Sequence, residues 1–213
     1  HGKLDYRQTL DYLPAQPAIS VTRLYLDGND YSTDFTGHLR FADVFGEDNL
    51  TVSLEAAHIS GGADYSYLDG FRLRAMTAKI WLGDGYRFTL DYRLQYDQRD
   101  DLREDDIRII ESGREQRIRA ELAFTVGSRT DLSLFGHYRH ARKDDDSRLQ
   151  DLDGSVRQLT RTTTGFTAGV EADYQLHRAA TLSAEARYES TDDSYELYRH
   201  DRLTLTVSAS YRF

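Results

Sequence analysis

The stretch Leu203-Thr-Leu-Thr-Val-Ser-Ala-Ser-Tyr-Arg-Phe213 alternates apolar and polar residues without a break. Successive side chains of an extended strand point to opposite faces, so the two kinds of residue separate. The apolar face would carry Leu203, Leu205, Val207, Ala209, Tyr211 and Phe213. This stretch therefore predicts a two-faced β-strand that ends on an aromatic residue.

The same period of two recurs along most of the chain. It is clearest in Tyr86–Asp97, where every second residue is tyrosine, phenylalanine or leucine. The other segments are Lys3–Tyr12, Thr33–Phe41, Leu50–Ala56, Phe71–Leu82, Arg117–Phe124, Asp131–Arg139, Gly165–Gln175 and Ala180–Glu189. Phe71–Leu82 is less regular, and we expect a bulge near Thr77. Together with the final stretch, these segments predict about ten strands.

Composition favours strands over membrane helices. The chain has 30% charged residues, a mean hydropathy of -0.67 and no cysteine. No apolar stretch approaches the roughly 18 residues that a spanning helix needs. Its 15 tyrosines and nine phenylalanines suit strands and the aromatic belts of membrane proteins. A hydrophilic average is compatible with a membrane barrel, because only alternate residues of a barrel strand meet lipid.

We therefore predict an all-β, transmembrane, antiparallel up-and-down β-barrel in one domain, residues 1–213, in the bacterial outer membrane. The expected partners are outer-membrane lipid and lipopolysaccharide, and the barrel-assembly machinery would act on the strand that ends at Phe213. We expect a monomer. The chain starts at His1 without a basic, apolar leader, so any signal peptide would already be removed.

The segment Leu13–Asp30 does not fit this pattern. Its apolar residues do not hold one phase, and Pro14 and Pro17 lie beside them. Counting Ala18–Leu26 as a strand would give eleven, whereas bacterial single-chain barrels have even counts. We favour ten strands with this segment as a loop, and twelve is the alternative.

The predicted connectors alternate in length. The short ones are Asp43–Asn49, Gly83–Gly85, Val126–Thr130 and Leu176–Ala179, and the long polar ones are Ser60–Gly70, Gln98–Glu115, Arg142–Arg157 and Thr191–Arg199. Outer-membrane barrels have short periplasmic turns and long external loops. With ten strands, Lys3–Tyr12 would start on the periplasmic side.

Placing the aromatic rows in lipid turns the alternate residues inward. Arginines and carboxylates are interspersed on that face, with Arg40, Arg139 and Arg187 among the inward arginines. Buried charges are tolerated when paired or hydrated, so the interior would be either a salt-bridged plug or a narrow aqueous channel. The candidate solute contacts, which neighbouring strands would bring together, are Arg72, Arg74, Arg87, Arg93, Arg117 and Arg119.

Several stretches resemble one family of channels. Tyr86–Asp97, Leu4–Arg7, Leu54–Ala56 leading into Ser60–Gly62, and Tyr211–Phe213 are similar to the small monomeric porins for acidic oligosaccharides, the oligogalacturonate and sialic-acid channels. This resemblance implies a twelve-stranded barrel with two facing basic tracks. The expected function is an outer-membrane channel for passive diffusion of small hydrophilic solutes, with acidic oligosaccharides as one candidate class.

Two other functions stay open. The barrel could be closed and act through its external loops, as a structural anchor or a partner-binding protein. Alternatively, His58-Ile-Ser60 resembles the His-x-Ser of outer-membrane phospholipase A and the lipid A deacylases, in which histidine activates serine for attack on an acyl ester. Here Gly61 follows the serine, where those enzymes usually have asparagine.

The sequence gives no sign of a cofactor or a metal site. His137 and His140 are three apart, which on a strand places them on opposite faces. The formal net charge of -9 argues against a nucleic-acid surface.

Overall fold

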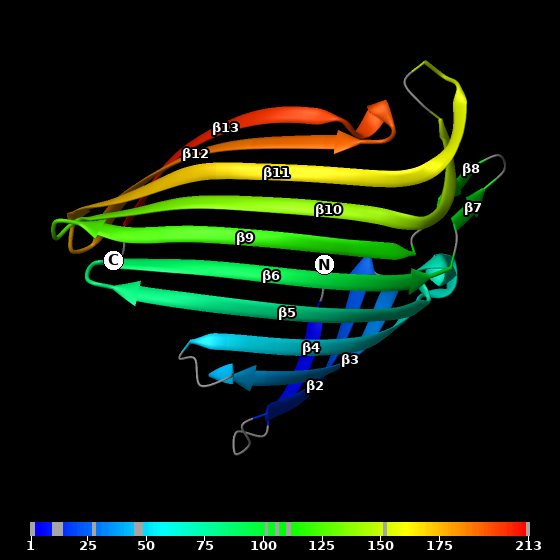
Figure 1. The fold of residues 1–213 in the computed structure, drawn as a ribbon, viewed down its shortest axis with the longest axis horizontal. Helices are drawn as coiled ribbons and strands as arrows, with labels where there is room; N and C mark the ends of the chain where they lie inside the picture. Colours follow the sequence, from blue (N-terminus) through cyan, green and yellow to red (C-terminus); the bar gives the residue numbers. More distant parts are fainter. Residues whose placement is uncertain are drawn as a thin grey trace.

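The chain folds into one strongly curved antiparallel β-sheet (Figure 1). The computed structural model describes residues 3–9, 15–26, 29–44, 49–100, 102–104, 107–109, 112–150 and 153–211. Its strands are β1 Lys3–Thr9, β2 Ala15–Leu26, β3 Asn29–Ala42, β4 Leu50–Gly61, β5 Gly70–Gly83, β6 Tyr86–Arg99, β7 Leu102–Glu104, β8 Ile107–Ile109, β9 Gly113–Val126, β10 Thr130–Gln150, β11 Val156–His177, β12 Ala180–Asp193 and β13 His200–Tyr211. Two short 3-10 helices, η2 Ala63–Leu68 and η3 Glu196–Tyr198, lie in connectors.

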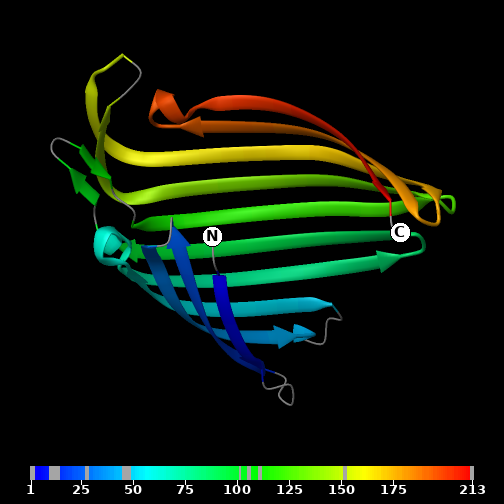
Figure 2. The ribbon, with the colours of Figure 1, turned by 180° about the vertical axis from the view of Figure 1, so that it is seen from behind.

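The strands follow one another in an up-and-down order. Each pairs with the next along the path β1-β2-β3-β4-β5-β6-β9-β10-β11-β12-β13, and the small β7–β8 hairpin joins β10 at Arg148. The expected all-β, antiparallel, up-and-down architecture is confirmed. Within the described residues β1 and β13 do not pair, so the sheet is open (Figures 1 and 2).

The expectation of ten strands is wrong, because the path through the described residues already contains eleven. The additional strand is β2, in the segment that the sequence placed in a loop. The apolar residues of β2 change phase because they lie on both faces of a regular strand: Ile19 and Val21 are on one face, and Leu24 is on the other. The register between β2 and β3 shifts at Leu24/Tyr25, where the extra residue is Tyr31 on β3. The last described pair between β1 and β2 is Thr9–Ala18, and Pro17 lies one residue beyond it. Pro17 is tolerated there because the missing N–H interrupts no described pairing with β1.

The odd strand count also fixes the direction of the first and last strands. In an antiparallel path of eleven strands, β1 and β13 run the same way. β13 ends at the short-turn end of the sheet, where residues 84–85, 127–129 and 178–179 turn the chain. β1 therefore starts at the opposite, long-loop end, contrary to the expectation from ten strands.

Two further expectations about local structure are wrong. No register shift occurs along β5, so there is no bulge near Thr77. The predicted loop Arg142–Arg157 is mostly strand: β10 and β11 continue as a hairpin beyond a register shift at Arg142/Asp146.

A buried tyrosine anchors this extended hairpin. The Tyr195 ring, from the connector between β12 and η3, is fully buried, and its hydroxyl donates to the backbone oxygens of Ser147 at 2.6 Å and Arg157 at 3.2 Å. The buried Asp193 carboxylate accepts a hydrogen bond from Nε of Arg161 at 3.1 Å, and that guanidinium lies 4.0 Å from the Tyr198 ring centre. These contacts hold the connector against the base of the hairpin.

The sheet keeps its large apolar side chains on the outside. Among the described residues the buried apolar ones are only Ala18, Ala57, Ile59, Leu149 and Tyr195. The outer face exposes Phe35, Leu54, Leu73, Leu90, Leu94, Ile118, Leu134, Phe166, Val170 and Leu205, among others. No described helix is both long and apolar enough to cross a membrane.

Candidate functional site

The inner face of the sheet contains a row of residues in which four of six are arginine. Residues directly opposite one another on successive strands form a rung, and one rung joins Arg40, Ser53, Met76, Arg93, Arg117 and Arg139 from β3 to β10. We call these six residues the arginine row. The rung continues through Gly165, Thr191 and His200 on β11 to β13, so none of its described members from β3 onward is acidic.

This arrangement places like charges directly opposite one another, which β-sheets usually avoid. Side chains directly opposite one another have Cβ atoms about 5 Å apart, and like charges in such pairs are destabilising. Arg93 faces Arg117, and Arg117 in turn faces Arg139. Three neighbouring guanidinium groups therefore need a compensating charge.

Glu115, two residues before Arg117 on the same face of β9, supplies that charge. Its Oε1 pairs with Arg93 Nη2 at 3.3 Å and with Arg117 Nε, and its Oε2 accepts from Arg139 Nε at 2.7 Å. The Glu115 side chain is 11% exposed. One carboxylate shared among three arginines leaves an excess of positive charge on this part of the face.

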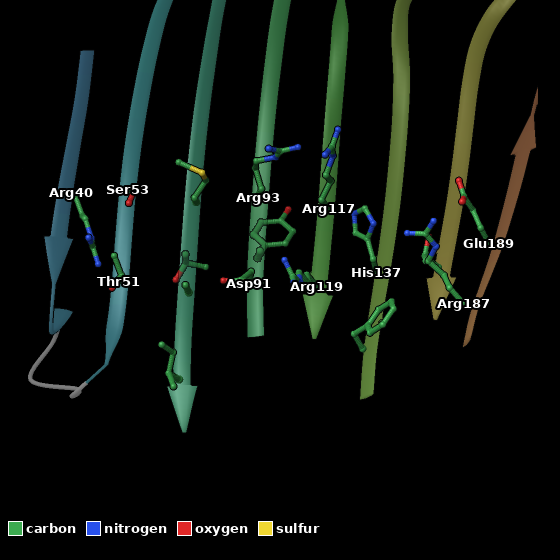
Figure 3. A pocket seen from close by; sticks show the side chains of 18 residues that line it. Arg40, Thr51, Ser53, Asp91, Arg93, Arg117, Arg119, His137, Arg187 and Glu189 are labelled. Atoms are coloured by element: carbon green, nitrogen blue, oxygen red, sulfur yellow. The ribbon is translucent and has the colours of Figure 1, made fainter. Parts of the chain in front are cut away.

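A cavity of about 930 Å³ opens at the arginine row (Figure 3). Its charged lining consists of five arginines and two acids: Arg40, Arg93, Arg117, Arg119, Arg187, Asp91 and Glu189. Thr51, Ser53 and His137 add polar atoms. The Nε atoms of Arg93 and Arg187 are buried and have no hydrogen-bond partner within the described part of the chain. The cavity wall is thus positive and has spare donors, although the whole chain carries a formal charge of -9.

The structure divides the six predicted solute contacts into three groups, all on the inner face. Arg93, Arg117 and Arg119 line the cavity. Arg72 and Arg74 lie nearer the long-loop end in ion pairs with Asp97 and Glu55, both at 2.8 Å. Arg87 lines a second cavity at the short-turn end and pairs with Glu121 at 3.4 Å.

Sequence reasoning did not select several important residues. Arg40 and Arg187 were placed on the inward face but not among the contacts, since nothing local shows that their strands reach the same cavity. Glu115 was assigned to a loop, whereas β9 starts at Gly113 and makes it an inner residue. If the alternation of Arg117–Phe124 had been continued two residues upstream, it would have predicted Glu115 as an inner residue of the strand.

His58 and Ser60 lie on the outer face of β4. His58 is opposite Phe35 on one side and Phe71 on the other, and both His58 and Ser60 are exposed. No hydrogen bond joins the two side chains in the described structure, so they do not form an assembled dyad here. Among the described residues no group of three or more histidine and acidic side chains could hold a metal ion.

Comparisons with protein-family models and with curated proteins found no match to this chain. The resemblance to acidic-oligosaccharide porins therefore stays a prediction.

Proposed function

We propose that this chain forms an outer-membrane β-barrel channel for passive diffusion of small hydrophilic solutes. The exposed outer face supports membrane insertion as part of this proposal. Water-soluble monomers rarely expose large contiguous apolar surface, whereas the outward rows of a membrane barrel are apolar and aromatic. Leu203, Leu205 and Val207 on β13 are 67%, 72% and 73% exposed, and among the described residues no strand pairs with the edge of β13 that faces away from β12.

The observation that carries the channel function is the cavity at the arginine row. Five arginines and two acids line about 930 Å³ of open space. Four of these arginines also reach Glu115, Glu121 or Glu185, so it is the open volume, lined mainly by arginine, that favours a channel over a filled plug. Guanidinium groups bind carboxylates through paired hydrogen bonds, so the arginine row suits acidic sugars as one class of solute.

The proposed channel needs closure of the sheet. Because β1 and β13 run in the same direction, direct pairing between them would be parallel, with evenly spaced, slanted hydrogen bonds. One further antiparallel strand between them would give the even count of bacterial barrels.

Planar-bilayer recording tests this function. Purified protein should insert and give stepwise conductance. The double variant Arg93→Ala with Arg117→Ala should change that conductance and weaken block by a short oligogalacturonate. The matched control is Arg23→Ala, because Arg23 lies away from the cavity in an exposed ion pair with Asp30. Folded protein that inserts but leaves the bilayer silent would contradict the channel.

One observation favours a second candidate function, a closed barrel that binds a partner through its loops. Tyr195 and Asp193 hold the β10–β11 hairpin in a defined position beyond the sheet. A fixed projection of this kind is a suitable binding platform, since little order has to be gained on binding. An electrically silent but correctly inserted barrel would support this function instead.

A further inference from the structure

We propose that the inner face carries two zones of opposite charge in series along the channel, and that the channel consequently rectifies ion current. This inference rests on the proposed channel function. The positive zone is the arginine row with its cavity. The negative zone lies closer to the short-turn end of the same face.

Five carboxylates define the negative zone. Asp131 on β10 lies directly opposite Asp173 on β11, and Glu171 on β11 lies directly opposite Glu185 on β12. Asp131, Glu171 and Asp173, together with Glu121, line the second cavity, of about 470 Å³, in which Arg87 is the one basic side chain. This zone is therefore as negative as the first cavity is positive.

Both zones repeat the same unfavourable feature. Like charges directly opposite on neighbouring strands destabilise a sheet. Wall charges that served only to neutralise each other would place an acid opposite each arginine. Instead, Arg93 faces Arg117 and Arg117 faces Arg139 in the positive zone, where only the pair Asp91–Arg119 among the described cavity residues sets an acid opposite an arginine. In the negative zone Asp131 faces Asp173 and Glu171 faces Glu185. This segregation fits a role in which each zone acts on mobile ions.

The two zones meet at a boundary, where Arg119 pairs with Glu121 at 2.8 Å and Arg187 with Glu185 at 3.9 Å. Their outer members are well separated, since Asp131 and Arg139 are eight residues apart on β10, which corresponds to about 27 Å along the strand. The Debye length is about 10 Å at 0.1 M salt and about 3 Å at 1 M. At low salt each zone therefore fills with its own counter-ions, chloride at the arginines and potassium at the carboxylates.

Two such zones in series make conduction depend on the sign of the voltage. When the short-turn side is positive, chloride leaves the arginine zone toward the junction and potassium leaves the acidic zone toward it, so carriers accumulate. The opposite voltage draws both ions away and depletes the junction. Because one-sign clefts raise local counter-ion concentrations by about tenfold or more, we expect the two currents to differ by at least about twofold at low salt.

Single-channel recording in potassium chloride tests this. At 0.1 M salt, currents at equal and opposite voltages should differ, and at 1 M salt the difference should disappear. The triple variant Asp131→Asn, Glu171→Gln, Asp173→Asn should still conduct, lose the asymmetry and become anion-selective by reversal potential. Ser133→Ala, between these residues on the same wall, is the matched control and should keep the asymmetry.

The outcomes separate the two proposals. A conducting channel with equal currents in both directions at 0.1 M salt would overturn the two-zone inference and leave the channel function standing. A triple variant that keeps full asymmetry would also overturn it. A silent bilayer would remove the channel function itself and the inference with it.

Discussion

Arg93 on β6 and Arg117 on β9 lie directly opposite one another, and both side chains reach the carboxylate of Glu115. A like-charge pair is thus held in place by an acid on the next inner position of the same strand. The stability of this part of the sheet therefore depends on Glu115 more than on either arginine.

Glu115→Gln should destabilise the protein by about 1–3 kcal/mol, because the neutral amide keeps one acceptor oxygen but removes the negative charge that three partly buried guanidinium groups share. Urea unfolding in detergent, followed by the change in gel mobility between folded and unfolded forms, would measure the loss. Glu189→Gln is the control. Its pair with Arg202 is more exposed and should cost less than about 1 kcal/mol. Equal effects of the two variants would contradict the special role of Glu115.

Tyr195→Phe should loosen the β10–β11 hairpin. It removes the hydroxyl that donates to Ser147 and Arg157 and leaves the Ser147 carbonyl without this donor, at a cost of about 1–2 kcal/mol. Limited proteolysis should then cut faster between residues 143 and 157. Tyr198→Phe keeps its ring beside Arg161 and should behave like the parent protein. Unchanged cleavage of Tyr195→Phe would show that the ring alone anchors the hairpin.

The two faces of the sheet should meet different environments in a bilayer. Spin labels at Leu90 and Leu205 on the outer face should be relaxed by oxygen, which concentrates in hydrocarbon. Labels at the adjacent inner positions Thr89 and Thr206 should respond to a water-soluble nickel complex. The reverse pattern, or a protein that stays dissolved without detergent, would rule out membrane insertion.

The β7–β8 hairpin should separate from β10 in acid. A backbone hydrogen bond from Asp146 and the Arg108 guanidinium together lower the pKa of Asp145. A carboxylate whose pKa is lower when folded stabilises the fold above its unfolded pKa, and this contribution disappears as the pH falls through the folded pKa. The protection factors of the backbone amides at Ile107–Ile109, which correct for the slower intrinsic exchange in acid, should therefore fall below about pH 4. Asp145→Asn should show fast exchange at neutral pH and no further pH-dependent step.

The sequence predicts the faces of this sheet better than its connections. Alternation identified Tyr86–Asp97 and the final strand correctly, because each strand is apolar on one side and polar on the other. It failed at β2, where Ile19 and Val21 lie on one face, Leu24 lies on the other, and Pro17 suggests a loop. Alternation identifies a strand only when its apolar residues keep to one face, and β2 places them on both.

The sequence could not predict the arginine row, for a different reason. Whether Arg40 shares a rung with Arg93 depends on the register across β3, β4, β5 and β6, which the intervening turns determine. An error of one residue in any turn would move Arg40 to the opposite face. The identity of inward residues was therefore predictable, whereas their neighbours across strands were not.

The shared direction of β1 and β13 has a practical consequence for anyone who labels this protein. A reporter fused ahead of Lys3 and one fused behind Tyr211 would emerge from opposite rims of the sheet. In an inserted channel, the first would face the surroundings of the cell and the second would face the periplasm. A membrane-impermeant dye added to intact cells would stain only the first, which makes the two fusions a direct readout of orientation.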